Sequence, residues 1–306
     1  MKRMETNFEY LLPRVKDALD NTNLDYTRQQ LSKLDKPTIF SGVGGSSVVS
    51  ELGRKAVAKK NGIITINSEP RDFIYRENRG FSNVVACSYS GNNFGVKLAF
   101  LNDLKKYLLS NNSFDDKDVT YLKYTTTIDE EKSFISLAGS LIPISILMDY
   151  YLDGKDDLIL DLIEEQDFNF ELNSNTYEIF SGYDTSAASK YLESTMTESG
   201  IGIPVIHDKY AFCHGRSTLG VHYNNTAIYF NRNTEFDQMI LEELKPYYEN
   251  IIIINSKFDD QILDDYYFLI KSMYLTRYIA NKQNEDLSHV NHSPLTKKVY
   301  KFHGNI

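Results

Sequence analysis

Two turns rich in glycine and serine are the first features of this sequence whose residue types suit chemistry. One has the sequence Ser-Gly-Val-Gly-Gly-Ser-Ser at residues 41–47, and the other has Ser-Tyr-Ser-Gly-Asn-Asn at residues 88–93. Each turn follows a short apolar segment and precedes a stretch with helical periodicity. Because ligands of open α/β sheets bind beyond the carboxyl ends of the strands, both turns are expected to lie where a ligand binds.

The first turn has the features of an anion-binding site. Gly44 and Gly45 allow the backbone to approach a ligand closely, and the expected helix after them offers the positive end of its dipole. Ser46 and Ser47 add two hydroxyl donors. Oxygen atoms of a phosphate group are the acceptors that such donors suit.

The second turn offers three neutral donors, Ser88, Ser90 and Asn93, which can surround one phosphate group. The chain carries a net charge of −9, so a bound phosphate must be held locally rather than by a basic surface. A neutral cradle also suits an enzyme that has to release its product. The sequence therefore predicts phosphate binding at this turn.

A dinucleotide-binding site is the alternative for the first turn. The dinucleotide fingerprint begins like Gly42-x-Gly44 but requires a third glycine, where this chain has Ser47. Glu69 stands near the position at which an acidic residue holds the ribose, so the first turn alone leaves this alternative open. The second turn argues against it, because a dinucleotide site has no use for a Ser-x-Ser-Gly turn.

Strand-like and helix-like segments alternate along the chain, which predicts an α/β protein with mostly parallel sheets and helices on both faces. Strands are expected at residues 37–40, 63–66, 84–87, 119–124, 177–180, 226–230 and 251–254. Helices are expected at residues 2–34, 46–60, 94–109, 133–151, 186–199, 235–248 and 260–281.

The same alternation divides the chain into two lobes. We expect a helical arm at residues 1–36, a first lobe at 37–165, a second lobe at 176–282, and a tail at 283–306 that closes over the site. The tripeptide Phe-Ser-Gly ends the first expected strand of each lobe, which suggests two copies of one unit.

Composition excludes several classes of partner. No apolar run reaches the roughly 18–20 residues that a membrane helix needs, and no basic run or stripe suits nucleic acid. The chain has two cysteines, too few for a disulfide framework. We therefore expect a cytoplasmic protein that binds neither membranes nor nucleic acid.

Together, the two turns resemble those of the sugar isomerase (SIS) family, which has a Gly-x-Gly-x-Ser turn and a Ser-x-Ser-Gly-x-Thr phosphate loop. The resemblance implies two tandem three-layer αβα lobes of flavodoxin-like type. It also implies that Ser46, Ser88, Ser90 and Asn93 bind the phosphate of a sugar, with Asn93 in place of the usual threonine. Both turns are similar to those of bifunctional phosphoglucose/phosphomannose isomerases. Residues 198–215 are similar to the isomerase half of glucosamine-6-phosphate synthase.

The resemblance further implies an aldose–ketose isomerase that works through an enediol on a hexose or hexosamine 6-phosphate. In that reaction a carboxylate moves a proton between C1 and C2, and a histidine helps to open the sugar ring. By resemblance, Glu198 is the base and His214 opens the ring, and Glu193 on the same helix is the alternative base. A homodimer is implied as well, in which His214 reaches the neighbouring subunit's site.

The tail contains the remaining candidate residues. By resemblance, Lys297 or Lys298 enters the sugar site. A metal site at Asp286, His289 and His292 is the alternative for this segment, but its spacing matches no standard ligand pattern. We expect no metal and no cofactor.

Two other functions stay open. A deglycase or lyase that cleaves a phosphorylated sugar–amine adduct can use the same glutamate and histidine. A sensor of sugar phosphate needs neither of them, so the presence of Glu198 and His214 favours an enzyme. Thr195 stands where the aminotransferring synthase has a lysine, so glutamine-dependent amination is not expected.

Overall fold

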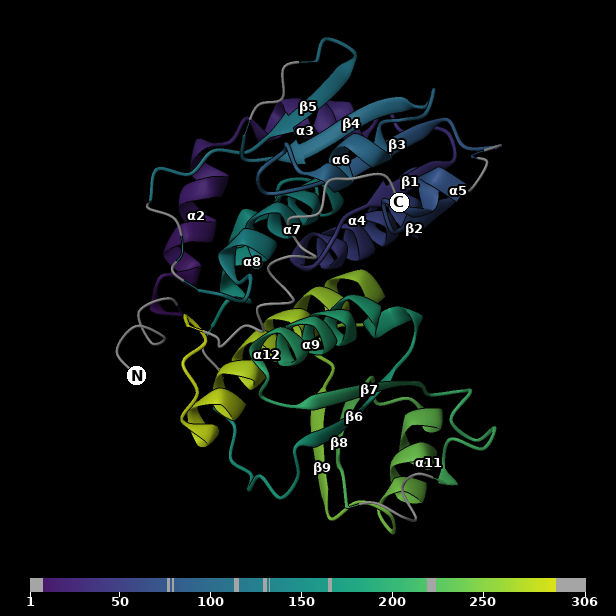
Figure 1. The fold of residues 1–306 in the computed structure, drawn as a ribbon, viewed down its shortest axis with the longest axis vertical. Helices are drawn as coiled ribbons and strands as arrows, with labels where there is room; N and C mark the ends of the chain where they lie inside the picture. Colours follow the sequence, from purple (N-terminus) through teal and green to yellow (C-terminus); the bar gives the residue numbers. More distant parts are fainter. Residues whose placement is uncertain are drawn as a thin grey trace.

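The computed structural model describes residues 8–75, 78, 80–112, 116–128, 131, 133–164, 167–218 and 224–289. Two sheets lie one above the other in Figure 1, and we call each sheet with its helices the upper lobe and the lower lobe. The upper strands are β1 (Thr38–Ser41), β2 (Thr65–Ser68), β3 (Asn83–Cys87), β4 (Lys105–Ser110) and β5 (Val119–Lys123). The lower strands are β6 (Thr176–Ser181), β7 (Ile203–Asp208), β8 (Thr226–Asn231) and β9 (Asn250–Asn255).

All the strand pairings are parallel, and the two sheets share one strand order. The upper order is β2-β1-β3-β4-β5 and the lower order is β7-β6-β8-β9, so β1 corresponds to β6 and β3 to β8. In the upper sheet β1 pairs directly with β3. The turns that follow these two strands therefore meet at the carboxyl edge of the sheet.

Helices cover both faces of each sheet. The upper lobe has α2 (Leu11–Asn21), α3 (Leu24–Leu31), α4 (Gly45–Asn61), α5 (Asp72–Tyr75), α6 (Phe94–Ala99), α7 (Ala138–Tyr151) and α8 (Asp156–Asp161). The lower lobe has the 3₁₀ helix η1 (Tyr183–Thr185), α9 (Ser186–Ser199), α11 (Glu235–Leu244) and α12 (Gln261–Gln283). The expected three-layer α/β fold is confirmed. Among the described residues, no helix is both long enough and apolar enough to cross a membrane.

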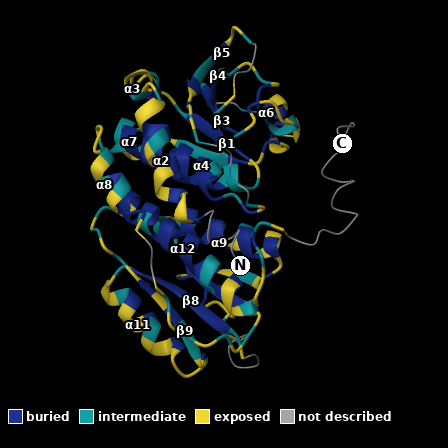
Figure 2. Ribbon diagram, turned by 90° about the vertical axis from the view of Figure 1, so that its left-hand side faces the viewer, coloured by how far each residue is buried: buried dark blue, intermediate teal, exposed yellow. Residues whose placement is uncertain are grey.

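The two lobes are joined by helices that face each other. Helix α4 of the upper lobe packs against α9 and α12 of the lower lobe, and the largest apolar core continues through this junction (Figures 1 and 2). A fully buried ion pair between Lys55 of α4 and Asp265 of α12 lies inside it. Lys55 also donates a hydrogen bond to Ser186 Oγ at 2.9 Å, at the start of α9. Because an unpaired buried charge is costly, this contact specifies how the lobes meet.

Three expectations about the elements are wrong. In place of one helix at residues 2–34, the described part of this segment has two, α2 and α3, which are separated at Thr22 and Asn23. The helix expected at residues 94–109 ends at Ala99, and the strand β4 follows it. The strand β7 was not expected at all. Pro204 interrupts its apolar pattern, but β7 is the edge strand of its sheet, where a proline costs no ladder hydrogen bond.

Candidate functional site

The first turn connects β1 to α4, and its backbone shape requires glycine. A side chain at Gly42 would collide with the carbonyl oxygen of Ser46. Gly44 has φ +56°, a left-handed conformation that favours glycine. A Cβ atom at Gly45 would lie 2.6 Å from Ser140 Oγ, at the start of α7. The glycines therefore let this turn lie close against α7.

Hydroxyl groups are the free donors of this turn. The backbone N–H groups of Ser46 and Ser47 already bond within the turn, to the carbonyls of Val43 and Gly44 at 3.1 and 2.8 Å. In the part of the chain that the structure describes, the hydroxyls of Ser46 and Ser47 have no hydrogen-bond partner, and both residues are half-buried. The side chains, rather than these two amides, are available to a ligand.

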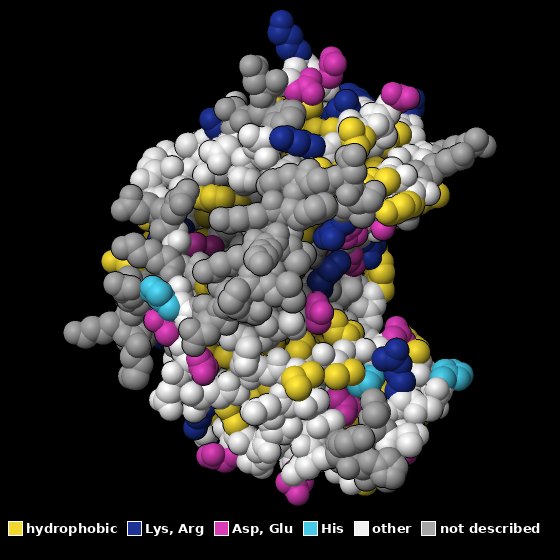
Figure 3. Space-filling model, in the orientation of Figure 1, with side chains coloured by type: hydrophobic (Ala, Val, Ile, Leu, Met, Phe, Trp, Pro, Cys, Tyr) yellow, Lys and Arg dark blue, Asp and Glu magenta, His cyan; other side chains and the backbone are white. Residues whose placement is uncertain are grey.

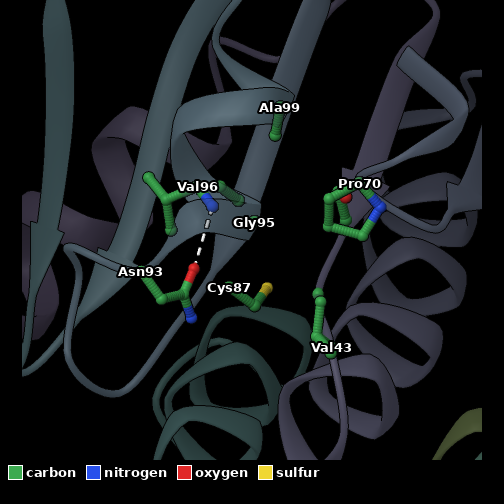
Figure 4. Close-up of a pocket in the computed structure, with 10 residues that line it drawn as sticks. Val43, Pro70, Cys87, Asn93, Gly95, Val96 and Ala99 are labelled. Atoms are coloured by element: carbon green, nitrogen blue, oxygen red, sulfur yellow. Dashed lines mark hydrogen bonds between the residues drawn. The ribbon is translucent and has the colours of Figure 1, made fainter. Parts of the chain in front are cut away.

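The second turn connects β3 to α6 and is held by its own side chains. Ser88 Oγ accepts hydrogen bonds from Gly91 N at 3.2 Å and from Asn93 Nδ2 at 3.1 Å. Asn93 Oδ1 accepts one from Val96 N at 2.9 Å and so caps α6 (Figure 4). Ser88 is buried, whereas Ser90 is exposed. Asn93 therefore shapes the turn, and Ser90 and the hydroxyl hydrogen of Ser88 remain for a ligand.

A small cavity lies between the two turns. Its volume is about 10 Å³, which is room for about one water molecule. Val43 and Asn93 line it from the two turns, together with Pro70 and Cys87 (Figure 4). Burial raises the pKa of the Cys87 thiol to about 12, so this cysteine is a protonated packing residue at neutral pH.

Glu198 comes to the first turn from the other lobe. Its Oε1 lies 3.7 Å from the position that a Cβ atom of Gly44 would take. The same oxygen accepts a hydrogen bond from Ser194 Oγ at 2.9 Å, one helical turn earlier on α9. Glu193 lies five residues before Glu198, which puts it about 140° away around the helix. Of the two carboxylates considered as the base, Glu198 is the one that adjoins the glycine turn.

The carboxyl group of Glu131 is buried next to this region, at the start of α7. It accepts hydrogen bonds from the N–H groups of Leu137, Ala138 and Gly139, at 3.1, 2.7 and 3.0 Å, at the start of α7. Burial raises its pKa, and these backbone donors partly offset the effect. The positive end of the helix dipole suits a carboxylate at this position.

The hydroxyl of Tyr191 is buried beside these carboxylates without a hydrogen-bond partner among the described residues. Burial raises its pKa well above 10, and the charges of Glu131 and Glu198 raise it further. A buried polar atom without a partner is uncommon and suggests that something else bonds to it.

Sequence reasoning did not select the residues around the start of α7 that lie against the first turn. Ser136 and Ser140 face Gly45 and bond to each other at 2.8 Å. Acidic residues at 129–131 precede the apolar stretch of α7, which is a sequence signal for a helix start that Glu131 caps. No comparable local signal marks Tyr191, because its position depends on how the lobes pack.

His214 does not share this region within one chain. Helix α9 leaves the carboxyl end of β6 and runs back along the sheet, so its last turn, with Glu198, lies at the amino edge of the lower sheet. His214 follows the carboxyl end of the parallel strand β7 and is exposed. The two predicted catalytic residues therefore lie at opposite ends of the strands of one sheet. Arg216, two residues after His214, donates a hydrogen bond to the carbonyl oxygen of Ile206 at 3.2 Å.

The first described residues of the tail contact the segment just before α7. The N–H of Phe134, just before α7, donates to the carbonyl of Leu287 at 2.9 Å. Lys297, Lys298 and His292 lie outside the described residues. Among the residues that are described, no group of three His, Cys, Asp or Glu side chains is placed to hold a metal ion.

A cleft of about 640 Å³ opens on the other side of the first turn, between the lobes. Figure 3 shows the hollow at the right-hand edge, where basic and acidic side chains gather. Its lining includes the first turn and the following charged or polar residues: Ser47, Glu51, Arg54, Asn67, Glu69, Arg71 and Lys190. The cleft is large enough for a small organic ligand.

No protein-family model and no curated protein matches this chain. Solved structures do match its fold. Tagatose-6-phosphate ketose/aldose isomerase from Escherichia coli has a TM-score of 0.74 at 12% identity, over 95% of this chain and 96% of that one. A proposed phosphosugar isomerase from Clostridium difficile 630 has a TM-score of 0.74 at 15% identity, over 97% and 98%.

A third match is the C-terminal domain of glucosamine-fructose-6-phosphate aminotransferase from Francisella tularensis. It has a TM-score of 0.71 at 10% identity, over 93% of this chain and 97% of that domain. At such low identity the likeness concerns the fold. The chain therefore has the fold of the sugar isomerase proteins.

Proposed function

We propose that this protein is an aldose–ketose isomerase of a hexose or hexosamine 6-phosphate. The observation that carries the proposal is the position of Glu198, whose carboxylate reaches from the lower lobe to Gly44 of the upper lobe's first turn. The proposed base, the two serine-bearing turns and the buried carboxyl group of Glu131 are thus assigned to one region. We also propose a cytoplasmic location, with lobes spanning residues 37–165 and 176–282.

In the proposed complex the phosphate lies between the two turns. Ser46, Ser47, Ser88 and Ser90 donate to its oxygens, and Gly44 and Gly45 allow a close approach. The uncharged donors leave the phosphate charge only partly balanced, which favours release of the product. Asn93 contributes mainly by holding Ser88 in position.

The proton transfer is assigned to Glu198. Its carboxylate removes the proton from C2 of the open-chain aldose, which produces an enediol. The same carboxyl group then returns the proton to C1, while the hydroxyl hydrogen of C2 moves to the former carbonyl oxygen. Aldose and ketose have the same composition, so no co-reactant is needed.

Ring opening is assigned to His214 of the neighbouring subunit in a homodimer. Support comes from the separation of Glu198 and His214 at opposite edges of the lower sheet, because one chain does not bring them together. Either Lys297 or Lys298 is proposed to complete the site. The contact of Leu287 with Phe134 starts the tail beside the wall that the sugar would meet.

A deglycase or lyase of phosphorylated sugar–amine adducts is the second candidate. The specific observation in its favour is the cleft of about 640 Å³ beside Gly44, which leaves room for a substituent next to the proposed base. Such an enzyme would use the same enediol-type proton removal at Glu198.

Proton NMR in D₂O tests the proposal. The protein is incubated with a panel of hexose and hexosamine 6-phosphates, and the C1 and C2 proton signals are followed. Loss of one of these signals together with a new sugar is the expected result. A panel whose members bind but exchange no proton would contradict isomerase activity and favour the second candidate.

A further inference from the structure

We infer that the lower lobe has a second anion-binding site, for the phosphate group of a small molecule, formed by Lys257, Tyr267 and Lys271. Tyr267 and Lys271 lie on α12, and Lys257 lies in the loop between β9 and α12. The described residues that line the interlobe cleft come from residues 42–71 and from Lys190, so this site is separate from the cleft. The inference goes beyond the proposed function and does not depend on it.

Lys271 forms the buried end of this site. Only 5% of the residue is exposed, and among the described residues its ammonium group has no ion-pair or hydrogen-bond partner. The ammonium lies over the ring of Tyr267, with Nζ 4.5 Å from the ring centroid. A cation–π contact replaces only part of the hydration that a buried ammonium group loses. An anion would supply the missing partner.

Lys257 forms the exposed end of the site and brings a second cation. Its Nζ lies 5.9 Å from the centroid of the same Tyr267 ring and 5.8 Å from that of Phe258. The two rings meet edge-on with their centroids 6.0 Å apart. In the part of the chain that the structure describes, the Lys257 ammonium has no carboxylate partner either. Two unpaired cations therefore share one aromatic ring.

The electrostatics of the two lysines favour a ligand with two negative charges. Burial, and then the positive charge of Lys257, lower the pKa of Lys271 to about 8, and the charge of Glu164 offsets only part of this effect. Like charges that are held close together without an anion repel each other. A phosphate dianion would neutralise both ammonium groups, whereas a carboxylate would neutralise one.

The carboxylates near this site are unavailable or too distant to play that part. Asp264 accepts a hydrogen bond from Arg232 at 3.0 Å. Asp265 forms the buried ion pair with Lys55. Glu164 is exposed and forms no ion pair with any described residue. In a chain with a net charge of −9, a pair of lysines without a carboxylate is a specific local feature.

The hydroxyl of Tyr267 can act as a third donor. Tyr267 is half-buried, and its hydroxyl has no hydrogen-bond partner among the described residues. Burial and the charge of Asp264 raise the pKa of this hydroxyl above 10, so it keeps its hydrogen at neutral pH. Two ammonium groups and one hydroxyl suit the several acceptor oxygens of a phosphate group.

NMR of protein labelled with ¹³C-lysine tests the inference, because the ε-CH₂ signal reports the charge of each amine without a reagent having to reach it. The signal of Lys271, assigned with Lys271→Arg, is followed against pH in chloride. The titration is repeated with ~20 mM inorganic phosphate or glycerol 3-phosphate, well above a millimolar Kd. We expect phosphate to raise the pKa of Lys271 by at least ~1 pH unit. The tighter ligand of the two shows whether the site takes free phosphate or a phosphate monoester.

Variants of the neighbouring charges sharpen this test. Lys257→Gln should raise the pKa of Lys271 in chloride, because it removes a like charge, and should weaken phosphate binding at least ~10-fold. Glu164→Gln should tighten phosphate binding, because it removes a negative charge that repels the ligand. Lys16→Gln, at an exposed position on α2, is the matched control and should change neither property.

The Ser88→Ala/Ser90→Ala variant separates this site from the proposed sugar-phosphate site, and the response of Lys271 should persist in it. A Lys271 signal that neither phosphate moves, or a response that Lys257→Gln leaves intact, would overturn the inference. Loss of the response in the Ser88→Ala/Ser90→Ala variant would also overturn it, by assigning the response to the proposed substrate site. Because the titration involves no turnover, none of these results depends on isomerase activity.

Discussion

The two lobes have the same strand order, yet their corresponding turns differ in how their polar groups are satisfied. In the upper lobe, the turn after β1 holds the hydroxyls of Ser46 and Ser47, which have no hydrogen-bond partner among the described residues. In the lower lobe, the hydroxyls at the start of α9 are bonded: Thr185 Oγ1 bonds Ser181 Oγ at 3.0 Å, and Ser186 Oγ donates to Glu51 at 2.6 Å. The turn after β1 has unbonded hydroxyl donors among the described residues, whereas the hydroxyls after β6 are hydrogen-bonded within the protein.

The second pair of turns shows the same contrast. Asn93 caps α6 after β3, and Thr234 caps α11 after β8. Only the lower turn adds buried charge: Asp237 accepts from Lys209 at 2.9 Å and from Tyr229 at 2.8 Å. The lower lobe thus contains its own anion at this position. Shared topology thus gives both lobes turns at the same position, and unbonded hydroxyl donors among the described residues are the reason for assigning the proposed site to the upper lobe.

The largest expected effect is on stability, in the lower lobe. Asp237→Ala should lower the free energy of unfolding by about 3–5 kcal/mol, because it leaves the buried Lys209 ammonium without its opposite charge. Denaturant unfolding measures this, with Glu235→Ala on the exposed side of α11 as the control. A variant that stayed stable but lost sugar-phosphate affinity would break the comparison.

Acid should weaken the junction between the lobes. Burial would raise the pKa of Glu51, but the hydrogen bond and charge of Arg54 lower it to about 2, and Ser186 adds to this lowering. A carboxylate with a lowered pKa stabilises the fold above its unfolded pKa of 4.5, and this contribution is lost as the pH falls from 4.5 towards 2.

About 3 kcal/mol of stability should disappear over that range. The free energy of unfolding, measured at several pH values in this range, should depend less on pH in Glu51→Gln than in the wild type. Glu193→Gln should leave the pH dependence unchanged. A wild-type pH profile that Glu51→Gln does not alter would contradict this account of the junction.

Substitutions in the turn at residues 88–93 of the upper lobe should change ligand affinity, whereas those in the lower lobe should change stability. Ser88→Ala/Ser90→Ala should reduce the affinity for a hexose 6-phosphate by at least ~30-fold, since each hydrogen bond to a charged group contributes about 1.5–3 kcal/mol. Titration calorimetry measures the change. Ser181→Ala in the lower lobe is the matched variant and should leave affinity unaltered. Undiminished affinity of the double variant would remove the phosphate turn from the site.

Two buried tyrosines give the smallest effects. Tyr191→Phe should change the free energy of unfolding by less than about 1 kcal/mol, because its hydroxyl makes no bond among the described residues. Tyr229→Phe should cost more, since that hydroxyl donates to Asp237. Thermal unfolding compares them. A larger loss for Tyr191→Phe would show that its hydroxyl has a structural partner.

Local signals in the sequence predicted the fold class and the two turns well. Glycine and serine at fixed positions after apolar strands depend on nearby residues only, so Gly44 and Ser88 could be selected directly. The strand β4 was missed because leucines and lysines at 104–109 favour a helix, and pairing with β3 and β5 overrides that preference.

Long-range packing determines the rest of the candidate site. Tyr191 and Lys190 gain their positions from the contact of α9 with the upper lobe, which no local pattern encodes. The separation of Glu198 from His214 follows from the missed strand β7, which runs between them from one end of the sheet to the other.

The central claim is that Glu198 moves the proton in a site shared by the two lobes. The most direct measurement is exchange of the C1 and C2 protons in D₂O by Glu198→Gln, with Glu193→Gln as the control. We predict that Glu198→Gln binds the sugar phosphate as tightly as the wild type and exchanges these protons at least ~10³-fold more slowly, while Glu193→Gln behaves normally. Normal exchange by Glu198→Gln would contradict the account.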